Sequence, residues 1–268
     1  MKRTLKLVLY YFGYQLAFTI VASVISVVLA HLGMVDKDVA LLNATAIALL
    51  LSGIMMGWHL IHFKYITFGW KSFGEVPAKS LWLSIPFILA SMVFINLCSE
   101  FIDLPNWMEN DFFAMSRNLF GILSVAVMAP VVEEFLFRGA IEGHLLRQGK
   151  KPWAAIFISA LVFGLIHINP AQVPFAFAIG LVFGWLYYRT GSMVPGILGH
   201  FINNSIACIQ MATLSKEELH TKTADMIGQE ATLALFLASF IVMAGLFLYM
   251  KKHLPEAPEY KEEESLTI

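Results

Sequence analysis

Long apolar stretches, separated by short polar connections, dominate the chain. A helix that crosses the hydrocarbon core of a bilayer needs about 20 mainly apolar residues. Stretches that reach or approach this length cover residues 5–31, 39–62, 81–99, 113–146, 153–168, 173–189, 194–212 and 231–250. The pattern therefore predicts an all-α polytopic membrane bundle with about eight transmembrane helices.

The charges in the connections predict how these helices are oriented. If the N-terminus is cytoplasmic, the basic residues on the cytoplasmic side are Lys2, Arg3, Lys6, Lys64, Lys71, Lys79, Arg147, Lys150, Lys151, Arg189, Lys251 and Lys252. The outer side then holds only Lys37, Arg117, Lys216 and Lys222. Because cytoplasmic loops carry the excess of Lys and Arg, both termini are predicted to be cytoplasmic. The short loops favour a multi-pass protein of a bacterial plasma membrane.

Composition supports a membrane protein and excludes several other classes. The chain is 58% hydrophobic and 14% charged, values outside the range of soluble domains. A net charge of −1 argues against binding to nucleic acid, which requires a basic surface. Cys98 and Cys208 form no CxxC pair, so neither a disulfide framework nor a zinc ribbon is predicted. The lipid bilayer is the expected partner, and the sequence carries no signal for an oligomeric state.

The chain reads as one membrane domain, residues 1–268, because no internal repeat or soluble module is evident. Residues 113–212 form its predicted core. The acidic end, residues 255–268, has the composition of a disordered tail.

One short charged run interrupts the apolar pattern. Glu133, Glu134 and Arg138 lie within six residues of an otherwise apolar segment, and each charge at membrane depth costs roughly 2.5–3.5 kcal/mol. Glu134 and Arg138 are four residues apart and share a helix face, which fits an ion pair. Glu133 lies about 100° further round the helix and has no local partner. A structural ion pair therefore accounts for only part of the run.

Other polar residues are predicted to lie in neighbouring helices. His167 falls in the stretch 153–168, and His200 and Asn204 lie one turn apart in the stretch 194–212. Buried polar groups in a membrane must satisfy one another, so these helices are expected to gather around one polar site. In a straight helix, His167 would lie roughly 20 Å from the cytoplasmic end. This is too close to the outer side of the membrane for a residue that shares a site with Glu133. A turn at residues 169–174 within the membrane would reconcile its depth with that of Glu133.

Three motifs on separate helices carry a family resemblance. They are EExxxR at Glu133–Arg138, FxxxH at Phe163–His167 and HxxxN at His200–Asn204. With the following Gly139, they resemble the CPBP intramembrane proteases, which include type II CAAX prenyl proteases and bacteriocin-processing or Abi-like proteins. The resemblance covers about residues 117–212. It implies that Glu133 and His167 activate a water and that His200 and Asn204 stabilise the oxyanion, while Glu134 and Arg138 hold the base in place.

A metal mechanism remains open beside this one. Glu133, His167 and His200 are also a set of side chains that binds zinc with a position left for water. The family has been described both as metalloproteases and as metal-independent glutamate proteases. No cofactor is firmly predicted, and zinc is the alternative.

The predicted function is an intramembrane endopeptidase that cleaves a membrane-embedded or lipid-associated peptide. The resemblance implies CAAX-like substrates or the processing of bacteriocins or signal peptides. Two other functions remain open. One is a non-catalytic immunity or scaffold protein, and the other is a proton-coupled transporter that uses the buried charges as a relay.

Overall fold

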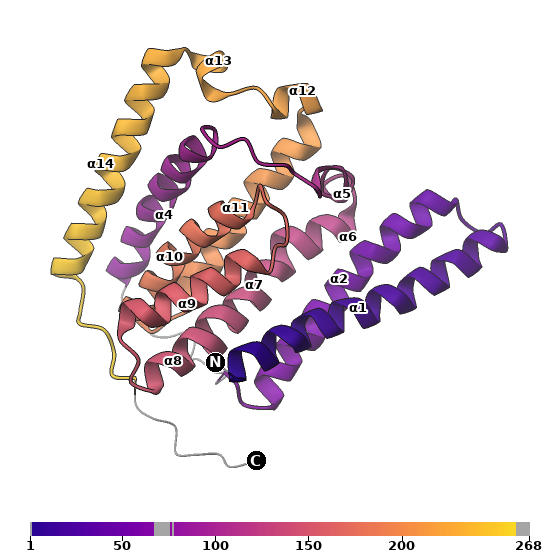
Figure 1. Ribbon diagram of the computed structural model, residues 1–268, viewed down its shortest axis with the longest axis horizontal. Helices are drawn as coiled ribbons and strands as arrows, with labels where there is room; N and C mark the ends of the chain where they lie inside the picture. The colour runs from indigo at the N-terminus through magenta and orange to yellow at the C-terminus, as the bar shows by residue number, and fades with distance from the viewer. Residues whose placement is uncertain (1, 67–75, 77, 261–268) are drawn as a thin grey trace. The chain divides into compact units, whose positions relative to one another are not determined.

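The computed structural model describes residues 2–66, 76 and 78–260, and in this part of the chain all regular structure is helical. The helices, labelled in Figure 1, are α1 (Lys2–His31), α2 (Lys37–His62), α4 (Ala78–Ser99), α5 (Glu109–Met115), α6 (Leu119–Ile122), η1 (Leu123–Met128), α7 (Ala129–Glu134), η2 (Phe135–Glu142), α8 (Gly143–Arg147), α9 (Pro152–Leu165), α10 (Val173–Thr190), α11 (Val194–Thr213), α12 (Lys216–Leu219), α13 (Thr223–Ile227) and α14 (Gln229–His253). Each apolar stretch predicted from the sequence overlaps one of these helices or the continuous run α6–α8. The prediction of an all-α membrane bundle is therefore confirmed.

Among the described residues, five helices are long and apolar enough to cross a membrane. They are Lys2–His31, Lys37–His62, Ala78–Ser99, the run Leu119–Arg147 and Gln229–His253. Helix α9 has 14 residues and is about 21 Å long, which is shorter than the hydrocarbon core. The number of eight crossings and the cytoplasmic placement of both termini stay predictions.

The described residues fall into two compact units that interleave along the chain. The first contains residues Met1–Tyr65, Met108–Leu136 and His200–Leu219, and the second contains Ile66–Trp107, Phe137–Gly199 and His220–Ile268. The prediction of a single domain stays a prediction, and each unit is described by itself.

The first unit is built around the antiparallel hairpin of α1 and α2. Asp36 caps α2 by accepting hydrogen bonds from the backbone of Asp38 and Val39, which satisfies two of the donors that a helix start leaves free. Helix α2 packs against α6, η1 and α7. A Cβ at Gly53 would lie 2.6 Å from Met128 Cγ, so glycine permits this close approach.

The predicted helix 113–146 is wrong at its start, because the chain turns before α6 begins. Asn118 has an extended backbone and its side chain accepts a hydrogen bond from Gly121 N, as an N-cap residue does. The same side chain donates to Asn43 Oδ1 on α2 at 2.6 Å. A Cβ at Gly121 would lie 2.2 Å from Met115 O, so only glycine fits beside the turn.

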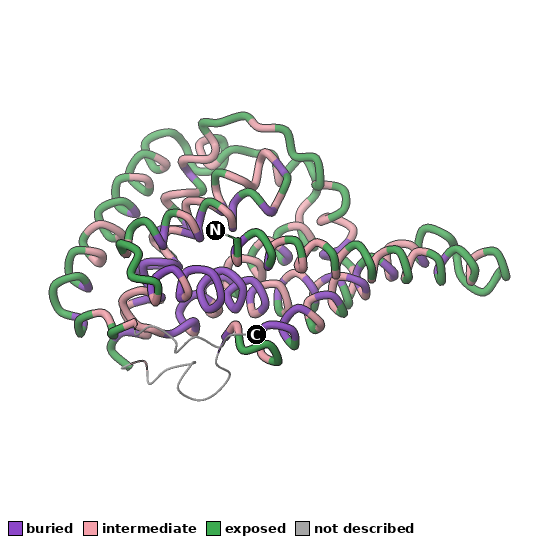
Figure 2. Tube along the Cα trace, turned by 60° about the horizontal axis from the view of Figure 1, so that its bottom comes forward, coloured by how far each residue is buried: buried purple, intermediate pink, exposed green. Residues whose placement is uncertain are grey.

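From α6 onward the run is continuous but contains two π-helical stretches, η1 and η2. Residues 132–143, which span the end of α7 and all of η2, are buried without interruption, and they belong to the buried helical stretch in Figure 2. A helix buried on every face is a core helix. The charged run therefore lies on a helix that is shielded from bulk solvent all round.

The second unit is organised by the α9–α10 hairpin, against which α4 packs through α10. A Cβ at Gly164 would lie 2.9 Å from Val173 O, and one at Gly180 would lie 3.0 Å from the Phe163 ring. These two glycines therefore allow close helix contact, as small residues do in membrane bundles. Helix α14 packs on α4.

Part of the predicted disordered tail belongs to the described chain. The Tyr260 hydroxyl donates to the carbonyls of Tyr187 and Tyr188, at 3.0 and 3.1 Å, so residues up to Tyr260 lie against the end of α10. Residues 261–268, with the acidic run, lie outside the described residues.

Candidate functional site

Glu133 and Glu134 are the last two residues of α7, immediately before the π-helical stretch η2. Glu133 is 7% exposed and Glu134 is fully buried. Single π turns within α-helices occur frequently at functional sites, because they change the direction in which neighbouring side chains point. Two adjacent buried carboxylates at such a change of helix geometry make this region the first candidate for a catalytic site.

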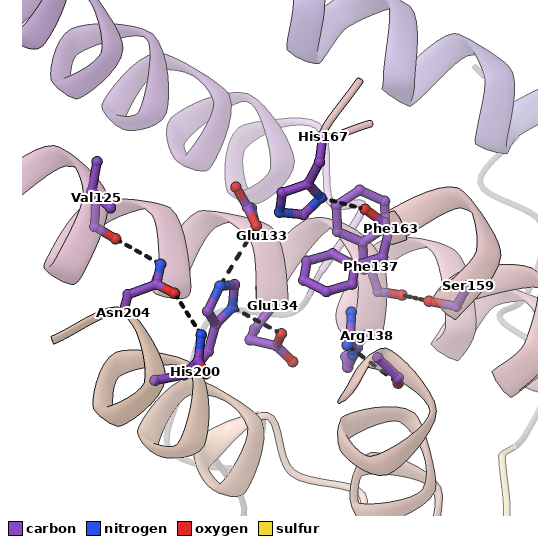
Figure 3. A network of polar contacts seen from close by, with 12 residues as sticks. Val125, Glu133, Glu134, Phe137, Arg138, Ser159, Phe163, His167, His200 and Asn204 are labelled. Atoms are coloured by element: carbon purple, nitrogen blue, oxygen red, sulfur yellow. Dashed lines mark hydrogen bonds and ion pairs between the residues drawn. The ribbon is translucent and has the colours of Figure 1, made fainter. Parts of the chain in front are cut away.

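His200 contacts both carboxylates from α11, within the first unit (Figure 3). Its Nε2 lies 3.8 Å from Glu133 Oε2, and its Nδ1 lies 3.4 Å from Glu134 Oε1. The imidazole is itself buried, with 5% exposure. One histidine therefore connects the two acidic side chains of the EExxxR motif.

The two oxygens of Glu133 have different surroundings. Oε1 accepts a hydrogen bond of 3.0 Å from the hydroxyl of Tyr11 on α1. Oε2 is buried and makes no hydrogen bond with any described residue. Its 3.8 Å separation from His200 Nε2 is too long for a hydrogen bond. A buried acceptor without a donor is costly, so this atom marks a place for a water or a substrate group.

Asn204 lies one turn after His200 on α11 and is tied to the helix that carries the glutamates. Its Nδ2 donates to the carbonyl of Val125, in the π-helical stretch η1, at 2.8 Å, and its Oδ1 accepts from Asn203 Nδ2 at 3.1 Å. The amide nitrogen of Asn has two hydrogens. The bond to Val125 uses one of them, which fixes the side chain and leaves the second for another acceptor.

Arg138 lies in the second unit and is fully buried. Its guanidinium donates to Gly180 O at 3.4 Å and lies over the rings of Phe163 and Phe183, at 4.7 and 5.6 Å from their centroids. Guanidinium groups are attracted to aromatic faces, more strongly when desolvated. These contacts join η2 to the α9–α10 hairpin.

His167 also contacts Phe163, one turn before it in α9. Its Nδ1 lies 2.9 Å from Phe163 O, and the two rings meet edge to face with centroids 5.2 Å apart. The contact at Nδ1 orients the ring and leaves Nε2 for other chemistry. His167 is half-buried, and α9 ends two residues before it.

The turn that follows His167 is strained and tied down. Ile168 has a positive φ of 53°, which is an outlier for a β-branched residue. The fully buried Asn169 accepts a hydrogen bond from Trp107 N at 3.1 Å and donates to Asn106 Oδ1 at 2.8 Å. Such strain persists only where the surroundings enforce it. We therefore infer that the two hydrogen bonds of Asn169 hold the turn in place, and we call this pair of bonds the Asn169 clamp. A turn directly after the short α9 supports the predicted turn within the membrane.

Asn169→Ala is expected to lower the free energy of unfolding by about 2 kcal/mol, because it removes both hydrogen bonds of this buried side chain, the one from Trp107 N and the one to Asn106 Oδ1. The measurement is thermal or denaturant unfolding in detergent. Asn106→Ala is the comparison, since it removes only the second of these hydrogen bonds, from the side of an exposed residue, and is expected to cost about 1 kcal/mol. Equal losses from both variants would contradict the clamp.

The structure thus brings four predicted residues together in the first unit, namely Glu133, Glu134, His200 and Asn204. Arg138 and His167 meet around Phe163 in the second unit. The predicted Glu134–Arg138 ion pair and the assembly of all these residues into one catalytic site stay predictions.

Sequence reasoning missed Tyr11 and the clamp at Asn169. A tyrosine in an apolar helix is ordinary, although a buried hydroxyl usually finds a partner, and that is the signal Tyr11 offered. The signal for Asn169 was its place in the polar turn beside His167.

Among the described residues, no three His, Cys, Asp or Glu side chains are arranged so that they could hold a metal ion. The zinc alternative with Glu133, His167 and His200 stays a prediction, because His167 lies in the second unit and the two others lie in the first.

Comparison with known proteins agrees with the motifs. Residues 115–206 match the family model for Rce1-like type II CAAX prenyl endopeptidases. The chain is similar to a putative membrane peptidase, YdiL of Bacillus subtilis, with 27% identity over 105 residues that cover 39% of this chain and 43% of the relative. It is also similar to the membrane-embedded CAAX protease MroQ of Staphylococcus aureus, with 30% identity over 93 residues that cover 33% of this chain and 38% of that protein.

The chain thus spans about two-fifths of the length of these curated relatives. No solved structure matches the chain. The family match and the apolar helices confirm the predicted resemblance and the multi-pass membrane location.

Proposed function

We propose that this multi-pass membrane protein, which carries the Rce1-like segment at residues 115–206, is an intramembrane endopeptidase. It hydrolyses a peptide bond of a membrane-embedded or lipid-associated peptide. The observation that carries the proposal is the asymmetry of Glu133. One of its oxygens accepts a hydrogen bond from Tyr11, and the other is buried beside His200 with no hydrogen bond to any described residue. A fixed carboxylate with one oxygen open to a water is what a general base requires.

The first step is the activation of water. A water beside the gap between Glu133 Oε2 and His200 Nε2, which are 3.8 Å apart, can lie about 2.8 Å from both atoms. Oε2 accepts a proton from this water as its oxygen attacks the scissile carbonyl carbon. The attack yields a tetrahedral intermediate with a negative oxygen.

The second step is the collapse of this intermediate. His200 and the second amide hydrogen of Asn204 are the donors that would stabilise the oxyanion, as pre-oriented donors do in other peptidases. The C–N bond then breaks, and the proton on Glu133 passes to the leaving amine. This restores the carboxylate and releases a carboxylic acid and an amine.

The remaining residues have supporting roles in this proposal. Glu134 orients His200 through the 3.4 Å contact at Nδ1. The family resemblance assigns His167 to water activation and Arg138 to holding the glutamates. These two roles depend on the motifs alone.

The names of the relatives suggest two broad classes of substrate. One relative is named as a CAAX protease and the other as a putative membrane peptidase, so a C-terminal lipidated peptide and a membrane-inserted signal or bacteriocin peptide are the two classes to test. Reconstituted protein incubated with one synthetic peptide of each class, followed by mass spectrometry, tests the proposal. Cleavage that Glu133→Gln removes supports an endopeptidase, whereas a scaffold or a transporter leaves both peptides intact.

Peptide cleavage is expected to continue in a metal chelator, because the proposed steps use Glu133, His200, Asn204 and water alone. The measurement is kcat of the purified protein before and after treatment with 1,10-phenanthroline, with the metal content determined by elemental analysis. We expect a change of less than about twofold. Loss of activity that added Zn²⁺ restores would contradict this mechanism and support the metal alternative.

A further inference from the structure

Helix α1 lies outside the segment that matches the family, yet it contacts the proposed base directly. The Tyr11 hydroxyl donates a 3.0 Å hydrogen bond to Glu133 Oε1. The family match begins at residue 115. The contact therefore comes from a part of the chain to which neither the motifs nor the comparisons assign a role.

We propose that Tyr11 is a positioning residue for the reaction and sets which oxygen of Glu133 acts as the base. The proposal rests on the function proposed above. A carboxylate can accept hydrogen bonds at both oxygens. Tyr11 occupies Oε1, so the carboxylate is oriented with Oε2, which makes no hydrogen bond with any described residue, towards His200 Nε2.

The consequence is kinetic. Without the Tyr11 hydroxyl, the carboxylate is free to rotate about its terminal bond, and Oε1 becomes a second acceptor that competes for the water. The distance between the base and the scissile carbonyl is then less well fixed, and orientation of reacting groups contributes strongly to rate. Substrate binding does not involve the hydroxyl, because Tyr11 acts through Glu133. The loss is therefore expected in kcat and not in KM.

The same helix provides a matched control. Tyr14 lies one turn from Tyr11, and its hydroxyl is 2.8 Å from His59 Nδ1. It therefore has the same chemistry and a similar half-buried position, but its partner is a histidine of α2 outside the proposed site. Tyr11→Phe and Tyr14→Phe each remove one hydroxyl that is engaged in a hydrogen bond between α1 and another helix.

The test compares kcat and KM for peptide cleavage by reconstituted wild-type protein, Tyr11→Phe, Tyr14→Phe and Glu133→Gln. Tyr11→Phe is expected to lower kcat about tenfold, as expected for loss of a hydrogen bond to a charged group, with KM within twofold. Tyr14→Phe is expected to keep both constants within about twofold. Unfolding temperatures of the two variants show whether either effect comes from lost stability.

The outcomes separate the two proposals. If Glu133→Gln abolishes cleavage and Tyr11→Phe behaves like Tyr14→Phe, the role of Tyr11 is wrong and the proposed function stands. A change of KM with constant kcat in Tyr11→Phe also overturns the role. If Glu133→Gln remains active, the proposed function itself fails. If Tyr11→Phe does not fold, 3-fluorotyrosine is introduced at position 11 instead, because it keeps the size and the hydroxyl of tyrosine. The proposal then requires that 3-fluorotyrosine changes kcat by at least twofold at position 11 and by less than twofold at position 14.

Discussion

Replacing Glu133 by glutamine is expected to lower kcat for peptide cleavage by about 10²–10⁴-fold, the usual contribution of a general base. Glutamine keeps the length of the side chain and can still accept the hydrogen bond from Tyr11. It has no oxygen basic enough to take a proton from water, so the water beside His200 is not activated. The measurement is the initial rate of cleavage by reconstituted protein, followed by mass spectrometry of the products.

The neighbouring carboxylate provides the control for this experiment. Glu134 is as buried as Glu133 and contacts the same histidine, through Nδ1 instead of Nε2. Because Glu134 acts through His200, Glu134→Gln is expected to lower kcat by about tenfold, the loss of one charged hydrogen-bonding contact. A larger effect at Glu134 than at Glu133, with both variants folded, would mean that the roles of the two glutamates are reversed.

The positions of the helices were predictable because apolar length determines them. A stretch of apolar residues in a membrane must satisfy its backbone hydrogen bonds internally, and a helix does so. Boundaries were less predictable, as the turn at Asn118 illustrates. Residues 113–146 are apolar on both sides of this turn, and only the cap and the close approach at Gly121 reveal it.

The π-helical stretches had no sequence signal that we recognised. The spacing of Glu134 and Arg138 indicates a shared helix face in an α-helix, but η2 between them has a wider turn. A change of helix type is decided by packing on all sides of a buried helix, which periodicity along one sequence does not record.

The sequence was enough to predict which residues are polar partners in the site, since charges at membrane depth require partners. The contact of His200 with both glutamates could not be derived, because it depends on how α11 lies beside α7. Tyr11 was not predictable for the same reason. It is separated from Glu133 by more than a hundred residues, and only the packing of the first unit brings them together.

The end of α9 agrees with the predicted turn that reconciles the depth of His167 with that of Glu133. A straight helix over 153–168 places this residue near the outer end of a full span. In the structure α9 ends at Leu165, and a strained turn at Ile168 follows. A helix of about 21 Å ends before it would cross the hydrocarbon core, so His167 need not lie at the outer surface.

Asn204→Ala is expected to lower kcat by about 10²–10³-fold, as observed when one donor to an oxyanion is removed. The structure gives the reason for a large effect from one amide. Val125 O holds one amide hydrogen at 2.8 Å, which fixes the direction of the other before the substrate arrives. A donor that is already oriented stabilises the developing charge without reorganisation. The measurement is kcat and KM with the same peptide, and KM is expected to change little, because the oxyanion forms only in the transition state.

Asn203 is the control, because it is the same residue type at the next position of α11 and is half-buried like Asn204. Its amide donates to Asn204 Oδ1 at 3.1 Å and supports Asn204 only indirectly. Asn203→Ala is therefore expected to lower kcat by less than tenfold. If Asn204→Ala loses stability but keeps kcat, the bond to Val125 is structural, and the oxyanion must be held by His200 alone. Loss of kcat in Asn204→Ala with the unfolding temperature unchanged distinguishes stabilisation of the transition state from support of the α11–η1 contact.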